Sequence, residues 1–499
     1  MMHAGQQAMP DHDVIIVGSG AGGAAATYQL VRAGLRVLLL EKGAALPRDG
    51  STLDVDRVVR RGEFLARERW LDGQGRTLVP EEHFNIGGKT KWYGAALFRF
   101  GAREFDADDA FACRGWPLGY RELAPYYDQA ETLLGVRHFE AEPDLKRIIG
   151  ALTANDGSWE ASPMPMGLAA GIAGNRREAA HFDGFASVAG LKGEAETSFL
   201  DAVTSSANLT LLQDAAVDTL LPAADDPTRI AGVRLADGRE FRAPHVLLAA
   251  GALHSPRILQ RYLASSGLAG RLPVAANVGR NLKLHVLTAM VAFSPRRMTD
   301  LIRKTAVLTH AQHPHSSVQP LGFDAELIAT LLPRFVPRFL ARALSERAYG
   351  FFLQTEDGSV AGNAISERAA ASGPTPVMDY AIDRLPAASR EHRRFTRALQ
   401  RSLLGIGLLA FTKRIGLAGT AHACGTMICG ASPADSVVDA RGAVHGMTGL
   451  YVVDGSVLPR SSRVNPSLTI YAWALRSASL IAASLRAGTN GQSTLEQLR

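Results

Sequence analysis

Residues 13–42 read DVIIVGSGAGGAAATYQLVRAGLRVLLLEK, and this stretch decides the fold. The apolar run Val14–Val17 predicts a short buried parallel strand, and Gly18, Gly20 and Gly23 follow it in the GxGxxG spacing. The first glycine permits a tight turn, the second lets the backbone approach a pyrophosphate, and the third lets the next helix pack close to the strand. We therefore expect a pyrophosphate over the N-terminus of that helix, where free N–H groups point toward it.

A second apolar run, Val37–Leu40, ends at Glu41, which lies where an acidic residue bonds a ribose hydroxyl. A glycine-rich turn without a ligand would leave this carboxylate unexplained, so the whole unit favours a dinucleotide site. The glycines do not distinguish FAD from NAD(P). That choice depends on the rest of the chain.

Bulk properties limit the class of protein. A chain of 499 residues exceeds the usual size of one domain, and 46% hydrophobic residues are enough for large cores. The net charge of +6 comes from scattered arginines without interleaved aromatics, which argues against nucleic-acid binding. The N-terminus has no basic start followed by an apolar stretch, and no apolar run is long enough to span a membrane. We expect a cytoplasmic protein without membrane contact.

The chain divides into segments of different character. Strand-like patterns run from about residue 195, with a hairpin signal at Asp237–Gly238, and a long helix is predicted over Pro466–Leu485. The expected class is α/β, with a Rossmann-like nucleotide-binding domain interrupted by an inserted second domain. The first domain is expected to comprise residues 10–130, 195–289 and 418–490. The second domain is expected to comprise residues 290–417. Residues 131–194 are expected to belong to the second domain or to connect the two.

Five separated motifs, spread in order over nearly the whole chain, resemble those of the glucose–methanol–choline (GMC) oxidoreductases, which are FAD enzymes. They are GSGAGG with Glu41, IGGKTKWYGAAL, LLAAGALHSPRIL followed by NVGRNLKLH at 277–285, HACGTMICG at 422–430, and GLYVVDGSVLPRSSRVNPSLTIYAWALRSA at 449–478. The third departs from the usual signature, because residues 260–264 push Ser266–Gly267 further away. The resemblance implies FAD as cofactor and an inserted substrate-binding domain built on an antiparallel sheet.

Finer features resemble a sugar-oxidising branch. WPLGYRELAPYYDQAE and HFDGFASVAGLKGEAE are similar to segments of pyranose 2-oxidases, glycoside 3-oxidases and aminoglycoside 6′-alcohol oxidases. In pyranose 2-oxidases a flavin-linking histidine stands just before a tryptophan. Here Lys91 precedes Trp92, so the resemblance implies FAD that is held non-covalently.

The resemblance also implies, position by position, which residues contact FAD. Val217 is expected to hold the adenine through backbone atoms. Asp454 and its neighbour are expected beside the ribityl chain and pyrophosphate, although a simple turn former is the alternative. The final helix is expected to point its positive end toward the flavin pyrimidine. The implied contact residues are Gly18, Ser19, Gly20, Ala21, Gly22, Gly23, Glu41, Lys42, Gly87, Gly88, Thr90, Trp92, Gly94, Ala95, Val217, Ala250, Gly251, Asp454, Gly455, Asn465, Pro466 and Ser467.

Oxidation of an alcohol needs a base for the hydroxyl proton and a group that holds the oxygen, while the flavin takes the hydride. His422 stands in an HxxGT arrangement that resembles the family's catalytic motif, and histidine titrates near neutral pH. Asn465, in VNP, matches the family's second catalytic position and can hold a hydroxyl without titrating. The alternatives are an ordinary buried histidine and a helix N-cap.

Other polar clusters have plainer interpretations. His310, His313 and His315 form an HxxHxH pattern, but no acidic or cysteine partner accompanies them, so we expect a solvated or substrate-lining loop and no metal site. The three cysteines, Cys113, Cys424 and Cys429, give neither a disulfide framework nor a zinc pattern. The last two are expected to be small packing residues.

Residues 325–344, AELIATLLPRFVPRFLARAL, mix large apolar residues with arginines, and two prolines interrupt any single helix. An interfacial membrane contact would explain this composition. Packing as a lid over the active site is the more ordinary interpretation, and we expect the lid.

These observations predict an FAD-dependent oxidoreductase that oxidises a CH–OH group of a sugar, glycoside or polyol to a carbonyl. His422 would take the proton, flavin N5 would take the hydride, and O2 or another acceptor would reoxidise the flavin. One alternative is an apolar alcohol as substrate, such as a sterol or long-chain alcohol. Another is a flavin-binding protein without turnover, against which the pair of His422 and Asn465 argues. The substrate, the acceptor and the oligomeric state stay open.

Overall fold

A parallel five-stranded sheet forms the first layer of the protein in a computed structural model that describes residues 11–331, 336–369 and 373–496. Its strands lie in the order β18-β10-β1-β2-β6, and all but the edge strand β6 are largely buried, as expected for a parallel sheet with both faces covered. The five are β1 (Val14–Val17), β2 (Val37–Leu40), β6 (Leu209–Leu212), β10 (His245–Leu248) and β18 (Leu450–Val452).

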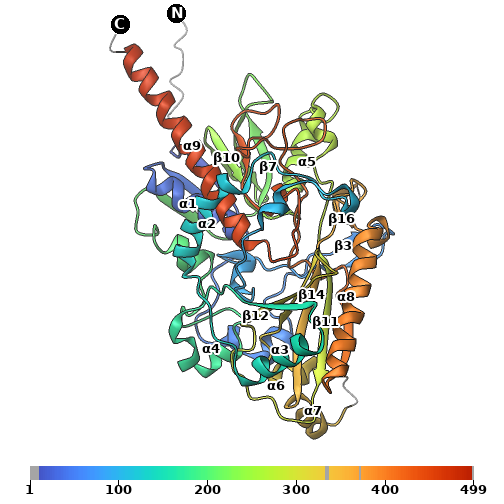
Figure 1. The fold of residues 1–499 in the computed structure, drawn as a ribbon. Coiled ribbons are helices and arrows are strands. Elements are labelled where there is room, and N and C mark those ends of the chain that lie inside the picture. Colours follow the sequence, from blue (N-terminus) through green and yellow to red (C-terminus); the bar gives the residue numbers. More distant parts are fainter. Residues whose placement is uncertain (1–10, 332–335, 370–372, 497–499) are drawn as a thin grey trace, which may run out of the picture.

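Three helices pack on one another beside this sheet. Helix α9 (Ser467–Glu496) lies against both α1 (Ala21–Arg32) and α2 (Tyr120–Leu134), and Figure 1 shows it running past them toward the C-terminus. By length and composition Ser467–Ala487 could cross a membrane, but 67% of its most apolar window is buried inside the protein. It therefore serves as a core helix of the nucleotide-binding layer.

The second layer is a six-stranded antiparallel sheet in the order β17-β11-β14-β13-β12-β5, seen in the lower half of Figure 1. Helix α8 (Pro386–Gly405) packs on its central strands, and α3 (Pro143–Asn155) packs on β5 and α8. The strands are β5 (Trp159–Pro163), β11 (Val286–Phe293), β12 (Ala306–His310), β13 (Ser316–Pro320), β14 (Ala348–Thr355) and β17 (Leu409–Arg414).

Smaller elements complete the fold. Two further sheets have the orders β15-β16-β3-β4 and β7-β8-β9. Their strands are β3 (Trp70–Asp72), β4 (Thr77–Leu78), β15 (Ala364–Arg368), β16 (Thr375–Asp379), β7 (Val217–Pro222), β8 (Ile230–Leu235) and β9 (Glu240–Arg242). The remaining α-helices are α4 (Arg176–Ala180), α5 (Ser255–Ser265), α6 (Ala325–Leu331) and α7 (Arg338–Ser345).

The predicted class is confirmed, with a parallel nucleotide-binding sheet and an antiparallel second sheet. The hairpin at Asp237–Gly238 joins β8 to β9, and the last helix begins directly after Pro466. Residues 70–78, from the first predicted segment, form a sheet with residues 364–368 and 375–379 from the inserted segment. The two layers are therefore linked by a shared sheet as well as by loops.

The close contact of α1 with two strand ends generates a prediction about stability. A Cβ on Gly22 would overlap the carbonyl oxygen of Val453, so Gly22→Ala should destabilise the protein by about 1–3 kcal/mol, the usual cost of overpacking. Gly150→Ala in α3 is the control, because an added Cβ there meets nothing within 4 Å. Thermal unfolding should show a lower Tm for Gly22→Ala alone. Equal Tm values for the two variants would contradict the packing argument.

Candidate active site

The N-terminus of α1 is built to receive an anion. Gly20 is its N-cap residue and supplies no side chain, so the first-turn N–H groups have no side-chain cap. A Cβ on Gly20 would meet nothing within 4 Å, which means that open space lies in front of these donors. Gly18, with φ of +100°, makes the preceding turn in a conformation that favours glycine. This cradle fits the pyrophosphate of a dinucleotide.

The second glycine-rich segment lies directly against the first. A Cβ on Gly88 would stand 3.2 Å from Cα of Gly20, and the backbone N–H of Gly87 donates to Ser19 Oγ at 3.1 Å. The structure thus brings together two predicted groups of cofactor residues that are almost seventy positions apart. Ala21, Gly22 and Gly23 continue into α1 behind them.

Glu41 is buried at the end of β2. Its carboxylate accepts hydrogen bonds from the Ser19 backbone N–H (2.9 Å), Ser19 Oγ (2.6 Å) and the Gly43 N–H (3.1 Å). Burial raises the pKa of this carboxyl, while the hydrogen bonds oppose the rise. Next to it, the Lys42 ammonium lies 3.7 Å from the centre of the Phe84 ring. Glu41 therefore holds the fingerprint turn in place besides being the predicted ribose ligand.

Several predicted contact residues have side chains that fasten the glycine-rich loop. Thr90 Oγ1 donates to the Gly87 carbonyl at 2.6 Å, and the Trp92 indole N–H donates to Asn85 Oδ1 at 3.0 Å. Lys91 is buried between two carboxylates, at 3.0 Å from Glu194 and 2.6 Å from Glu196. These three side chains therefore hold the loop through protein partners.

Gly94 and Ala95 continue this loop. A Cβ on Gly94 would overlap the ion pair of Asp183 and Lys304, whose charged atoms are 3.1 Å apart. Ala95 adopts a positive φ of 51°. Only glycine fits at position 94, because the loop backbone lies in close contact with this buried ion pair.

The C-terminal motif joins the same region through Asp454. Its carboxylate accepts hydrogen bonds from the Gly251 N–H (2.8 Å), Ser255 Oγ (2.5 Å) and both the N–H and hydroxyl of Ser456. Burial raises its pKa, and these donors counteract the rise. Ala250 donates its N–H to Ser255 at 3.0 Å, so the turn after β10 is tied to the end of β18. Gly455 follows Asp454 in a short helical turn, and Val217 begins β7.

The two predicted catalytic residues are in contact. His422 Nε2 lies 3.1 Å from the amide nitrogen of Asn465, and Asn465 Oδ1 accepts a 2.5 Å hydrogen bond from the side-chain amide of Gln319. Asn465 directly precedes Pro466 and the start of α9, whereas Gln319 lies in β13 of the antiparallel sheet. The pair therefore sits where the two layers of the molecule meet.

A second histidine fixes the tautomer of the first. His285 Nε2 lies 2.8 Å from the Ser462 carbonyl, which can only accept, so neutral His285 carries its proton there. His285 Nδ1 is then an acceptor, and His422 Nδ1–H donates to it across 3.1 Å. This network assigns the lone pair of His422 to Nε2, beside Asn465. An unprotonated Nε2 is what a general base requires.

The electrostatics keep His422 unprotonated. The side chain is only 9% exposed, and this burial lowers its pKa well below 6.5. Lys304 and Lys89 add positive charge that lowers the pKa further. At neutral pH the imidazole is therefore the free base.

Sequence reasoning did not single out His285 and Gln319, although His285 ends the quoted segment NVGRNLKLH. His285 has a positive φ of 61°, and Gln319 is fully buried in a strand of the inserted domain. The sequence of this strand, SSVQP, carries no signal for Gln319, because the burial of its amide is seen only in the folded protein.

The histidine cluster does not form the expected solvated loop. His310 and His313 are buried and pack around Trp159 and Phe395. His315 turns the other way, to Glu356 at 3.1 Å. The three rings thus diverge into separate surroundings, and packing rather than solvation explains the first two.

The two late cysteines are free and buried. Burial raises the pKa of Cys424 to about 12 and raises that of Cys429 strongly. Both therefore stay protonated and behave as small packing residues, as predicted.

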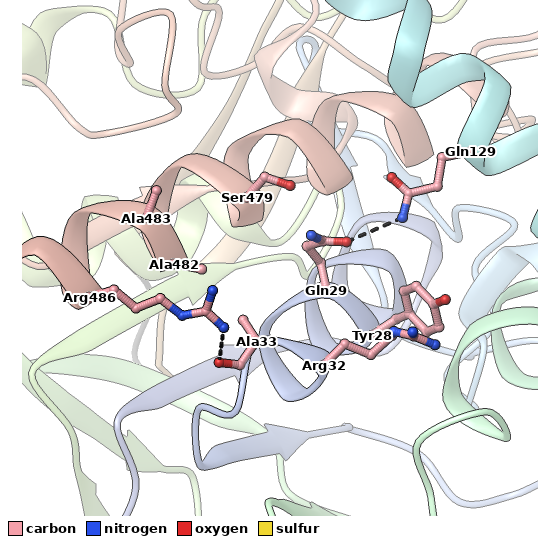
Figure 2. Close-up of a pocket in the computed structure, with 9 residues that line it drawn as sticks. All are labelled: Tyr28, Gln29, Arg32, Ala33, Gln129, Ser479, Ala482, Ala483 and Arg486. Atoms are coloured by element: carbon pink, nitrogen blue, oxygen red, sulfur yellow. Dashed lines mark hydrogen bonds between the residues drawn. The ribbon is translucent and has the colours of Figure 1, made fainter.

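Two surface hollows lie outside the catalytic pair. The one in Figure 2, of about 420 Å³, is formed by α1, α2 and α9 on the side away from the fingerprint turn, where Arg486 donates to the Ala33 carbonyl at 2.5 Å. The other, of about 320 Å³, is lined by His285, Tyr380 and Arg414 among others.

Fold and site together define a class of enzyme. Family models described as GMC oxidoreductase match residues 14–287 and 363–474, so the chain belongs to the GMC oxidoreductases. It is accordingly an FAD-dependent oxidoreductase of the type that oxidises alcohols, and the open cradle at Gly20 fits that cofactor.

Individual relatives agree with this assignment. The chain is 30% identical to paromamine 6′-oxidase of Streptomyces fradiae and to 6‴-hydroxyparomomycin C oxidase of Streptomyces lividus, over 95% of this chain and 92% of each relative. Among solved structures, a formate oxidase of Aspergillus oryzae matches with a TM-score of 0.69 at 15% identity, covering 97% of this chain and all of that one. The last likeness concerns the fold alone.

The place of Glu41 generates a prediction about cofactor retention. Glu41→Ala should lose the anchor of the fingerprint turn and a ribose acceptor, so the purified protein should carry much less FAD than the parent. The FAD-to-protein ratio, from absorbance after gel filtration, measures this. Glu63→Ala, at an exposed ion pair with Arg57, is the control and should keep its flavin. Parental flavin content in Glu41→Ala would remove Glu41 from the cofactor site.

Proposed function

We propose that the enzyme oxidises a CH–OH group of a sugar, glycoside or related polyol to the carbonyl, with His422 as the base. The observation that carries the proposal is the hydrogen-bond network that presents the Nε2 lone pair of His422 beside the Asn465 amide. The names of two relatives, which describe oxidases of paromamine and of a hydroxyparomomycin, support a hydroxyl on a sugar-containing substrate.

FAD, when bound, supplies the hydride acceptor. A substrate hydroxyl between the two catalytic side chains donates its hydrogen to His422 Nε2 and accepts from the Asn465 amide. As the proton moves to Nε2, the Asn465 N–H groups stabilise the negative charge that grows on the oxygen. Lys91 is already held by Glu194 and Glu196, which supports FAD bound without a covalent link at this loop.

Polar groups near the pair favour a hydroxylated substrate over an apolar one. Gln319 and Gln354 are fully buried, and the Oε1 atom of each has no hydrogen-bond partner. Buried acceptors of this kind are normally satisfied, and the hydroxyl groups of a sugar would satisfy them. Phe352, whose ring centre is 6.3 Å from that of His422, supplies an apolar surface on the same side. An aromatic ring beside polar acceptors suits the C–H face and the hydroxyl edge of a sugar ring.

The rival substrate class is an apolar alcohol, and anaerobic bleaching of the flavin separates the two. Glycosides and aminoglycosides should reduce the bound flavin, whereas sterols and long-chain alcohols should not. Reduction by the apolar alcohols alone would overturn the sugar proposal and leave alcohol oxidation standing. A flavin that no alcohol reduces would contradict turnover altogether.

The catalytic pair generates a prediction about rate. His422→Ala should slow anaerobic flavin reduction by about 10²–10⁴-fold, the usual contribution of a positioned general base. FAD content should stay near that of the parent, because His422 is not among the residues that form the cradle at Gly20. Asn465→His should keep part of the activity, since related enzymes place histidine there. Stopped-flow absorbance measures the rate, and a His422→Ala enzyme within a few-fold of the parent would disprove the assignment.

The low pKa of His422 generates a prediction about pH. Activity requires the unprotonated imidazole, so the rate of flavin reduction should stay constant from neutral pH to below 6.5 and fall only at lower pH. His285→Leu removes the acceptor for Nδ1–H and should reduce the rate roughly tenfold, about the value of one hydrogen bond. His285→Asn, which retains an acceptor, should recover part of that loss. An acid limb centred near 6.5 in the parent would show that burial does not set this pKa.

A further inference from the structure

The exposed large apolar side chains gather at one end of the molecule. Eight such residues are strongly exposed in the described part of the chain, and six of them belong to three adjoining elements. Phe339 is 78% exposed and Phe411 59% exposed, far beyond what a core role would allow. We call this group the apolar tip, and its members are Phe339, Leu340 and Leu344 of α7, Leu404 of α8, and Leu409 and Phe411 of β17.

Strand pairing shows that these residues are neighbours. Leu409 pairs with Phe293 in β11, and Phe293 pairs with Ala348, which begins β14 just after α7. The rings of Phe293 and Phe411 are 6.0 Å apart. Figure 1 shows α7 at the lower end of the molecule, next to the lower ends of β11 and α8. The apolar tip is therefore a single surface.

Cationic side chains cover the adjoining surface. Helix α8 carries five arginines against one acid, and its other face is buried on the sheet through Phe395 and Leu399. The five, which we call the arginine face, are Arg390, Arg393, Arg394, Arg397 and Arg401, all exposed. In the part of the chain that the structure describes, no carboxylate pairs with any of them. These arginines lie close together in the sequence between Arg390 and Arg401, and the helix places them on its exposed face.

Basic residues also border the apolar tip on the side of strands β17 and β11. Lys413 and Arg414 are exposed on the edge strand β17, and Arg296 is exposed after β11. The acidic residue Glu346, at the end of α7, is already paired with Arg297 and Arg342, at 3.3 Å each. An apolar end bordered by cations is the pattern of proteins that lie on a membrane surface.

We propose that the apolar tip and the arginine face dock on an anionic membrane surface. The tip enters the boundary between headgroups and acyl chains, and the arginines bind lipid phosphates. A second copy of the chain is a poorer occupant, because an isologous contact through α8 and β17 would place arginines against arginines. In α7, Phe339, Leu340 and Leu344 are exposed, whereas Leu327 of α6 packs inward with Phe185. The expected role of residues 325–344 as a lid stays a prediction. Residues 332–335 lie outside the described residues.

Sedimentation of the FAD-loaded enzyme with vesicles tests the proposal. Vesicles of phosphatidylcholine mixed with anionic phosphatidylglycerol should bind the enzyme, those of phosphatidylcholine alone should bind it much less, and added salt should release it. Replacing Arg394, Arg397 and Arg401 by Gln should weaken binding roughly a hundredfold, since each surface cation contributes about a fivefold factor. Phe339→Ser with Phe411→Ser should also reduce binding, with turnover of a water-soluble substrate unchanged.

Matched variants elsewhere on the surface are the controls. Val59→Ser with Val79→Ser removes exposed apolar side chains outside the tip, and Arg121→Gln with Arg271→Gln removes exposed arginines outside the arginine face. Both should bind vesicles like the parent. Equal loss in the controls, or no binding of the parent to anionic vesicles, would overturn the proposal. A third outcome would also overturn the proposal: the parent is a dimer in analytical ultracentrifugation, and Phe339→Ser with Phe411→Ser makes it a monomer. The tip would then be an interface between two copies of the chain.

Discussion

The structure depends on one steric constraint, the close approach of the first helix to the ends of two strands. A Cβ on Gly18 would come within 2.5 Å of the Ala249 carbonyl oxygen, and one on Gly22 would overlap that of Val453. Glycine therefore lets three segments from the beginning, middle and end of the chain converge on one point. The buried carboxylates of Glu41 and Asp454 then tie the turns together by accepting backbone and hydroxyl hydrogen bonds. The cradle for FAD is the outcome of that convergence.

The proposed catalytic residues and their partners span both layers. Asn465 and His422 belong to the last segment, but Gln319 reaches Asn465 from the antiparallel sheet, 146 residues away in sequence. The orientation of the Asn465 amide, which we propose holds the substrate oxygen, therefore depends on how the two layers are packed. The proton position on His422 depends in turn on His285, whose own proton is fixed by a backbone carbonyl. Small movements between the layers would disturb substrate orientation before they disturbed cofactor binding.

Local patterns in the sequence were enough for the parallel sheet and for the pairing of His422 with Asn465. GxGxxG followed by Glu41 specifies its own geometry within thirty residues, and the late motifs lie in one continuous segment. Gln319 and His285 could not be found in this way, because their roles arise from contacts between distant segments. The burial of His310 was missed for the same reason, whereas the arginines of α8 form a local pattern that the sequence does show. Thr90 and Trp92 were predicted to contact the cofactor, but their polar side-chain groups bond to other protein groups. A glycine-rich loop does not reveal from its sequence which side chains turn toward the protein.

The order of strands in the parallel sheet affects how the protein is made. Strands β1 and β2 leave the ribosome early, but their neighbour β10 follows much later, and β18 and α9 come at the end. Until then the fingerprint turn lacks the strand ends that close it, and an apolar edge stays open to wrong partners. Cofactor loading is thus a late event in biosynthesis, and a nascent chain that stops before residue 450 would be a flavin-free substrate for chaperones and proteases.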